Sequence, residues 1–175
     1  MTLGIVQSFL VFVLFQCAVP SRRTILNRKD DYKMEIAIIA HDTKKELMVQ
    51  FCIAYCGVLS QHKLCATGIT ANYIADATGL EIEHMLSGEH GGEQQITSRI
   101  VYNEIDMVLY FRDTRPTAYD ESMHELLRMC DYNNVPVATN IATAEALISA
   151  LSRGDFDWRE IYNPRSEYNL NKAGK

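Results

Sequence analysis

The sequence has no excess of basic residues. Its 17 Lys and Arg are outnumbered by 22 Asp and Glu, which gives a formal net charge of -5 at pH 7. Proteins that bind nucleic acids normally display a basic stripe, whose contacts with phosphates release counterions. The composition therefore argues against a nucleic-acid partner, and any phosphate ligand must be held by local geometry rather than by overall charge.

The sequence also lacks the cysteine spacing of a structural metal site. Its 5 cysteines are odd in number and form neither a CxxC pair nor a Cys/His pattern of the kind that zinc needs. Cys52 and Cys56 are spaced so that they share one helical face. We nevertheless interpret the cysteines of the folded part as core residues, because free cysteines in a reducing compartment behave as small hydrophobic side chains.

The first 33 residues differ from the rest of the chain. Residues 3–20 are apolar, no Lys or Arg precedes them, and residues 21–33 are polar without periodicity. Three interpretations stay open for this segment: an extension or a start placed too early, a short membrane anchor, or a cleaved signal peptide. We expect a cytoplasmic protein, with membrane anchoring by residues 3–20 as the alternative. Residues 164–175 are expected to form a polar tail.

Short apolar runs alternate with longer amphipathic runs from Met34 onward, which is typical of a parallel sheet covered by helices on both faces. The length and composition are those of one globular domain with one core. The pattern thus predicts the α/β class: a single doubly wound, three-layer domain over residues 34–163 with a five-stranded, mainly parallel sheet. Strands are predicted at 35–40, 63–66, 82–86, 107–111 and 135–138, and helices at 44–59, 72–78, 94–102, 121–132 and 142–151.

A polar or glycine-rich segment follows each predicted strand. In chain order these segments read HDTKK, TGIT, SGEHGGEQQ, RDTRPTAYD and TNIAT. In open α/β sheets, ligands bind outside the carboxyl ends of the strands, where loops lead into helices. The convergence of these segments predicts a binding site at that edge of the sheet.

Two of these segments suit phosphate chemistry. The amides and hydroxyls of TGIT at residues 67–70 can bind a phosphate with help from a helix dipole, although Thr and Gly at such turns also serve only as caps. Lys45 either adds a charge to that site or lies on a solvated face. The glycines around Ser87 and Glu93 imply a sharp turn or a close backbone approach. Glu93 begins a helix, where the dipole alone favours an acidic residue, or else it is catalytic.

Several separated motifs together resemble the methylglyoxal synthase family across residues 34 to about 163. They are HDTKK with the preceding strand, ATGIT, LSGEHGGEQQ, NEIDMVLYFRD, LLRMCD and NVPVATNIATAE. The resemblance implies a carbon–oxygen lyase that converts dihydroxyacetone phosphate to methylglyoxal and inorganic phosphate. In that family a carboxylate removes a carbon-bound proton, and the resulting enediolate expels phosphate. The resemblance also implies no cofactor, a small-molecule phosphate substrate as the partner, and a homo-oligomer, commonly a hexamer.

The same resemblance assigns roles to particular residues. Glu93 becomes the catalytic base, His41 and Lys45 become substrate ligands, and Asp42 and Asp113 take supporting acidic positions. The phosphate and substrate contacts are assigned to Thr67, Gly68, Ile69, Thr70, Ser87 and Gly88.

The sequence departs from the family's pattern at the base and in the loop after the fourth strand. The usual base is an aspartate in GGDQQ, whereas this chain has Glu93, which reaches one methylene further. Tyr119 stands where the family has a histidine, and Ser122 where it has a later aspartate. Because a tyrosine hydroxyl can donate to an oxyanion, Tyr119 is either a substitute substrate-binding donor or a packing residue. The alternative to an active enzyme is a module that binds a phosphorylated metabolite for regulation.

Overall fold

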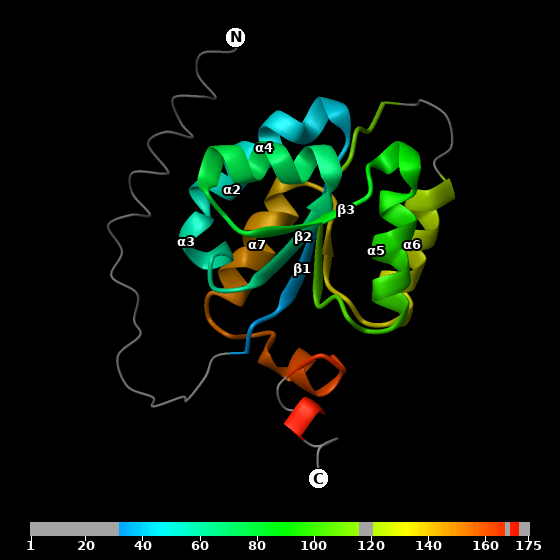
Figure 1. The fold of residues 1–175 in the computed structure, drawn as a ribbon. Helices are drawn as coiled ribbons and strands as arrows, with labels where there is room; N and C mark the ends of the chain where they lie inside the picture. The colour runs from blue at the N-terminus through cyan, green and yellow to red at the C-terminus, as the bar shows by residue number, and fades with distance from the viewer. Residues whose placement is uncertain (1–31, 116–120, 167–168, 172–175) are drawn as a thin grey trace. The chain divides into compact units, whose positions relative to one another are not determined.

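The computed structural model describes residues 32–115, 121–166 and 169–171. Its centre is a five-stranded, all-parallel sheet with the strand order β3-β2-β1-β4-β5 (Figure 1). The strands are β1 (Glu35–Ala40), β2 (Lys63–Thr67), β3 (Ile82–Met85), β4 (Met107–Phe111) and β5 (Val137–Ala138). The predicted α/β class and the five-stranded sheet are therefore confirmed.

Helices cover both faces of this sheet (Figure 1). One apolar core joins the sheet to α2, α4 and α7, and the other joins it to α5 and α6. The longer helices are α2 (Lys45–Ala54), α4 (Gly68–Thr78), α5 (Gly92–Val101), α6 (Glu121–Tyr132) and α7 (Ile141–Leu151). The shorter ones are η1 (Asp42–Lys44), α3 (Cys56–Leu59), η2 (Gly88–His90) and η3 (Asp157–Ile161).

Both faces of the central strands are buried, which explains their continuous apolar sequences. In β1, Ile36 and Ile38 belong to the core on the α2 side, whereas Ala37 and Ile39 belong to the core on the α5 side. This is the alternation expected of a strand, because successive side chains point to opposite faces. By the same alternation, Tyr110 in β4 belongs to the core that α5 and α6 share.

The strand register brings the carboxyl ends of the strands to one edge of the sheet. Ala40 at the end of β1 pairs with Phe111 at the end of β4, and Thr67 at the end of β2 pairs with Met85 at the end of β3. The loops that follow these strands therefore begin side by side, as the sequence predicted.

Two predicted helices differ from the structure by more than two residues at an end or by a break. The helix predicted over residues 44–59 is divided at Tyr55, whose φ of -108° and ψ of 17° leave the helical region. The helix predicted over residues 72–78 begins four residues earlier, at Gly68. The TGIT segment therefore forms the cap and the first turn of α4 rather than a loop before it, so its backbone N–H groups are those of a helix N-terminus.

The last predicted strand is shorter than expected. β5 contains only Val137 and Ala138, whereas the prediction covered residues 135–138. Pro136 has no N–H group to donate to the ladder, although its carbonyl oxygen accepts from Val108 N at 3.0 Å. Val135 N donates to Cys130 O instead, at 2.9 Å, and this bond belongs to the end of α6 rather than to the sheet.

The described cysteines behave as the sequence suggested. Cys52, Cys65 and Cys130 are buried in the two cores, Cys56 is half-buried, and all four are free thiols. Burial raises the pKa of the Cys52, Cys65 and Cys130 thiols to about 12, so these three are core residues with little thiolate at neutral pH.

In the described part of the chain, no helix is long and apolar enough to cross a membrane. The apolar run at residues 3–20 and the aligned Tyr119 lie outside the described residues.

A fully buried arginine attaches η3 to the opposite, amino-terminal edge of the sheet. Arg159 donates from Nη1 to the carbonyl oxygens of Asn133 at 3.0 Å and Asn134 at 3.1 Å, and from Nη2 to that of Ile105 at 3.1 Å. Its Nε lies 3.5 Å from Oδ1 of Asp106, which is also fully buried. This ion pair ties the segment after α7 to the residues that precede β4.

The other oxygen of Asp106 joins further parts of the chain. Oδ2 accepts from the Tyr32 hydroxyl at 2.6 Å, from the backbone N–H of Glu35 at 2.9 Å and from Asn163 Nδ2 at 2.9 Å. The residues on either side of the folded core, Tyr32 and Asn163, thus meet on one buried carboxylate, which needs a positive partner to remain charged.

We expect the Arg159→Met variant to lose about 3–5 kcal/mol in free energy of unfolding, because Asp106 would stay buried without its cation. Arg153→Met is the matched control, since the Arg153 side chain is 61% exposed beside Asp155 and should contribute less than about 1 kcal/mol. Urea denaturation of both variants measures the difference. Equal losses would show that the buried pair contributes no more than a surface pair.

Candidate active site

The predicted site residues gather at a cleft of about 400 Å³ at the carboxyl edge of the sheet. Every described one of them except Gly68 lines this cleft, and Tyr119 lies outside the described residues. Those that do are His41, Asp42, Lys45, Thr67, Ile69, Thr70, Ser87, Gly88, Glu93 and Asp113. Ile39, Ala40, Thr43 and Glu89 complete the lining.

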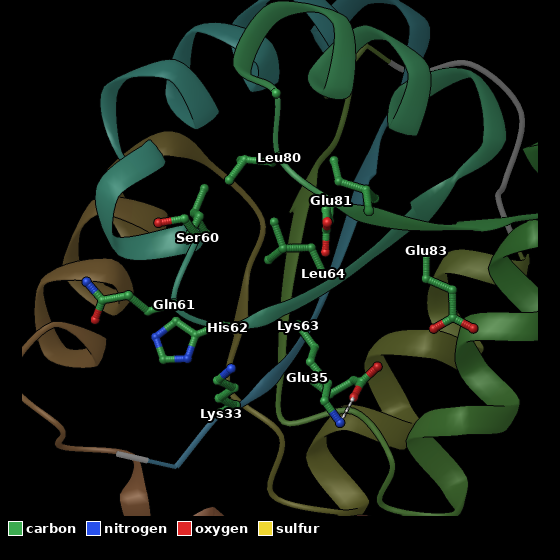
Figure 2. A pocket seen from close by; sticks show the side chains of 13 residues that line it. Lys33, Glu35, Ser60, Gln61, His62, Lys63, Leu64, Leu80, Glu81 and Glu83 are labelled. Atoms are coloured by element: carbon green, nitrogen blue, oxygen red, sulfur yellow. Dashed lines mark ion pairs between the residues drawn. The ribbon is translucent and has the colours of Figure 1, made fainter. Parts of the chain in front are cut away.

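A larger cavity of about 640 Å³ lies at the opposite edge, where the strands begin (Figure 2). Its lining includes Glu35, Lys63 and Glu83, and the Lys63 ammonium lies 4.0 Å from the Glu35 carboxylate. None of the predicted site residues that the structure describes reaches it. We place the chemistry in the smaller cleft, because ligands of open α/β sheets bind where strands end and where helix N-termini point.

The TGIT segment forms one wall of the cleft. Thr67 adopts an extended conformation ahead of α4, and no side chain of the described residues caps this helix N-terminus. Ile69 and Thr70 lie in its first turn, where backbone N–H groups lack intrahelical acceptors. Gly68 is not among the residues that line the cleft, and its N–H donates to the Leu86 carbonyl at 3.3 Å. This wall can bind an anion through amides, hydroxyls and the helix dipole.

The glycines of SGEHGGEQQ are needed for two different reasons. Gly91 has a φ of 90°, which side chains other than glycine rarely adopt. At Gly92 an added Cβ would lie 2.0 Å from the Leu86 carbonyl oxygen, so the start of α5 packs directly against the backbone after β3. Both the sharp turn and the close approach that the sequence implied are present, and together they place Glu93 at the cleft.

The residues after β1 and β4 form another wall of the cleft, and the charged side chains there are already paired. Lys45 forms an ion pair with Asp42, and its side chain is only 18% exposed, whereas that of Asp42 is 91% exposed. The hydrogen bond from Lys45 lowers the pKa of Asp42. Hydrogen bonds from Arg115 lower the pKa of Asp113 well below its usual value, and Thr43 Oγ1 donates to the same carboxylate at 2.8 Å. Lys45 therefore faces the cleft rather than a solvated surface.

The Glu93 carboxylate accepts a hydrogen bond on each of its oxygens. The Tyr110 hydroxyl donates to Oε1 at 3.1 Å, and the Ser122 hydroxyl donates to Oε2 at 2.6 Å. These donors come from β4 and from the start of α6, so three elements meet at the carboxylate.

His41 extends this arrangement across the cleft. Its Nδ1 accepts from the backbone N–H of Asp113 at 2.9 Å, and its Nε2 lies 2.9 Å from the Tyr110 hydroxyl oxygen. A backbone N–H can only donate, so Nδ1 carries no hydrogen and the ring hydrogen is on Nε2. His41 then donates to Tyr110, and Tyr110 in turn donates to Glu93.

The sequence analysis missed Tyr110 and gave no role to Ser122. The signal for Tyr110 was a hydroxyl within the otherwise apolar run MVLYF, because a buried polar group needs a partner. His90, which the sequence suggested was a surface residue without a partner, is exposed, but its Nδ1 lies 2.6 Å from the Ser87 hydroxyl oxygen. Among the described residues, no three His, Cys, Asp or Glu side chains are grouped so that they can hold a metal ion.

Comparison with known proteins returns one family. The family model described as "MGS-like domain" matches residues 48–139. The methylglyoxal synthase of Caldicellulosiruptor saccharolyticus is 57% identical over 137 residues, which is 78% of this chain and 97% of that protein. The methylglyoxal synthase of Oceanobacillus iheyensis is 50% identical over 135 residues, which is 77% of this chain and 96% of that protein.

A solved structure agrees with these sequence matches. The crystal structure of methylglyoxal synthase from Elizabethkingia anophelis NUHP1 is similar with a TM-score of 0.62 at 36% sequence identity. The match covers 67% of this chain and 78% of that chain. The likeness therefore extends from the sequence to the fold.

We expect inorganic phosphate to stabilise the protein against thermal unfolding, and Lys45→Met to weaken that effect. The loss of a charged donor should reduce phosphate affinity by about tenfold or more. Lys63→Met removes the same charge at the opposite edge, where its side chain is 58% exposed, and should leave the effect unchanged. Differential scanning fluorimetry at increasing phosphate concentrations measures the phosphate-dependent rise in Tm of both variants. The same phosphate shift in Lys45→Met as in the parent would place the anion elsewhere.

Proposed function

The chain belongs to the methylglyoxal synthase family of lyases, and on that basis we propose that its cleft converts dihydroxyacetone phosphate to methylglyoxal and inorganic phosphate. The observation that supports this reaction best is the position of Glu93. Its carboxylate lines the same cleft as the first turn of α4 and Lys45. A base and an anion site within one cleft are what proton abstraction followed by phosphate loss requires.

We propose that the phosphate group binds at the N-terminus of α4. Thr67, Ile69 and Thr70 offer hydroxyl and amide donors there, and α4 is 11 residues long, so its dipole favours the anion. Ser87 and Gly88, from the loop after β3, line the same wall. The bound phosphate would compete with Asp42 for Lys45, which exchanges one anionic partner for another.

Glu93 then removes a proton from the hydroxymethyl carbon next to the carbonyl group. Negative charge develops on the carbonyl oxygen as the enediolate forms, so this oxygen needs a hydrogen-bond donor in the transition state. His41 also lines the cleft, but its ring hydrogen is directed to Tyr110. We therefore assign this donor to Tyr119, the residue aligned with the family's histidine, with His41 as a further substrate contact and Asp42 and Asp113 in supporting roles.

Phosphate loss completes the reaction without a redox partner or a water molecule. The enediolate forms a new carbon–carbon double bond as the bond between carbon and the phosphate oxygen breaks, and the departing phosphate takes the hydroxyl proton. The remaining enolate becomes methylglyoxal when its terminal carbon receives a proton, which protonated Glu93 can return. The substrate atoms are thus divided between methylglyoxal and hydrogen phosphate, and the base is regenerated.

We also propose that the chain works in the cytoplasm as a homo-oligomer, with the hexamer as the expected size. Free, buried thiols such as Cys52 and Cys65 fit a reducing compartment. Exposed apolar side chains such as Tyr102, Tyr132 and Ile161 fit a surface that associates with further copies.

We expect Glu93→Gln to lower kcat by about 10²–10⁴-fold, because the amide cannot accept the substrate proton. The assay follows methylglyoxal and inorganic phosphate together from dihydroxyacetone phosphate, and both should form in equal amounts with the parent. Glu81→Gln, at the opposite cavity, is the control and should retain full activity. Phosphate binding by the parent without turnover would assign the cleft to metabolite binding alone.

A second substitution tests the assigned oxyanion donor. Tyr119→Phe should lower kcat by about 10²-fold with little change in KM, because the hydroxyl would act mainly on charge that develops in the transition state. Tyr119→His should retain more activity than Tyr119→Phe, since a neutral imidazole can also donate. Steady-state kinetics of both variants distinguish a donor from a packing residue, which would give Tyr119→Phe the parent's kcat.

A further inference from the structure

We propose that Tyr110 and Ser122 are positioning residues for the base, and that they fit a glutamate at position 93 rather than an aspartate. This inference rests on the proposed function, because it assigns the two hydroxyls to the geometry of Glu93 during proton abstraction. Neither hydroxyl lines the cleft, so neither is assigned contact with the substrate.

The two hydrogen bonds fix the orientation of the carboxylate. Tyr110 binds Oε1 at 3.1 Å and Ser122 binds Oε2 at 2.6 Å, so each oxygen has its own donor. One donor on each oxygen restrains the rotation of the carboxylate about its last side-chain bond. An ionised carboxylate offers about four acceptor positions, so further lone pairs remain for the substrate proton.

Tyr110 is a rigid donor with a defined direction. Its side chain is fully buried in the core under α5 and α6, and its hydroxyl oxygen lies 2.9 Å from His41 Nε2. Because His41 receives a hydrogen bond from Asp113 N–H on Nδ1, its own hydrogen points from Nε2 toward Tyr110. The phenol therefore accepts from His41 and directs its single hydrogen to Glu93. The backbone after β4 thus orients the base through two intervening side chains.

The length of the side chain explains why these two donors suit a glutamate. An aspartate at the same backbone position would end one carbon–carbon bond earlier, about 1.5 Å closer to the helix. Hydrogen bonds of 2.6 and 3.1 Å do not tolerate an increase of that size, because oxygen–oxygen hydrogen bonds normally span about 2.5–3.0 Å. The two hydroxyls thus stabilise the longer carboxylate in its extended position and would release a shorter one.

The first test removes each hydroxyl from the full chain. Tyr110→Phe and Ser122→Ala should each lower kcat by about tenfold while KM stays within about twofold, since the lost bonds position the base and do not bind substrate. The double variant should lose about 10²-fold or more, because neither oxygen would then be held. Ser122→Thr keeps a hydroxyl and should recover most of the activity lost in Ser122→Ala. Tyr162→Phe removes the hydroxyl of a residue that is 58% exposed and has no assigned role, and it should behave as the parent.

The second test asks whether the two hydroxyls affect kcat only when the side chain at position 93 has the length of a glutamate. In the Glu93→Asp background, Tyr110→Phe and Ser122→Ala should change kcat by less than about twofold, because the shorter carboxylate no longer reaches either hydroxyl. A merely structural role would lower kcat by the same factor in both backgrounds. Thermal unfolding of every variant, with and without phosphate, separates loss of fold from loss of positioning.

The outcomes separate this proposal from the proposed function. Turnover that disappears in Glu93→Gln but is unchanged in Tyr110→Phe and Ser122→Ala would overturn the positioning roles alone. Equal losses in the two backgrounds would also overturn them. If Glu93→Asp has no measurable turnover, the proposal is decided by the split between kcat and KM and by the recovery in Ser122→Thr. A parent chain without turnover would overturn both the function and the positioning.

Discussion

The start of α5 lies so close to the backbone after β3 that a methyl group at Gly92 would come within 2.0 Å of the Leu86 carbonyl oxygen. Glycine is the residue that permits this approach without displacing the strand, and the approach leaves the helix little freedom to shift against the sheet. Glu93 follows directly, so its carboxylate has a fixed origin. The reach of that carboxylate to β4 and to α6 depends on this single backbone contact.

The alternation of side chains along β4 determines which residue meets that carboxylate. Phe111 packs in the core on the α2 side, whereas Tyr110 packs in the core on the α5 side, where Glu93 and Ser122 also lie. A hydroxyl within a buried strand is tolerated because it both accepts and donates a hydrogen bond. The same burial that stabilises the core therefore also gives the Glu93 carboxylate a rigid partner.

The ion pairs at the amino ends of the strands differ in burial from those at the carboxyl ends. At the amino edge, Asp106 and Arg159 are fully buried together, and their bonds connect segments on either side of the core. At the carboxyl edge, Asp42 is largely exposed, and Lys45 can exchange it for a ligand at low cost. Buried pairs are expensive to break, whereas exposed pairs are readily rearranged. The separation allows the cleft to accept a charged ligand without disturbing the bonds that stabilise the fold.

Local sequence patterns determined the class of fold and the place of the cleft. Apolar periodicity predicted the strands and most helices, and the polar segments after the strands predicted the position of the cleft that Glu93 lines, because these features depend on residues close together in the chain. The same patterns misplaced the start of α4 and the division at Tyr55, where backbone angles decide the outcome. Tyr110 and Ser122 lie 17 and 29 residues from Glu93, and Arg159 lies 54 residues from Ile105, so their contacts arise only when the sheet brings distant segments together. The sequence shows which side chains are polar, but tertiary packing determines which group a buried polar side chain contacts.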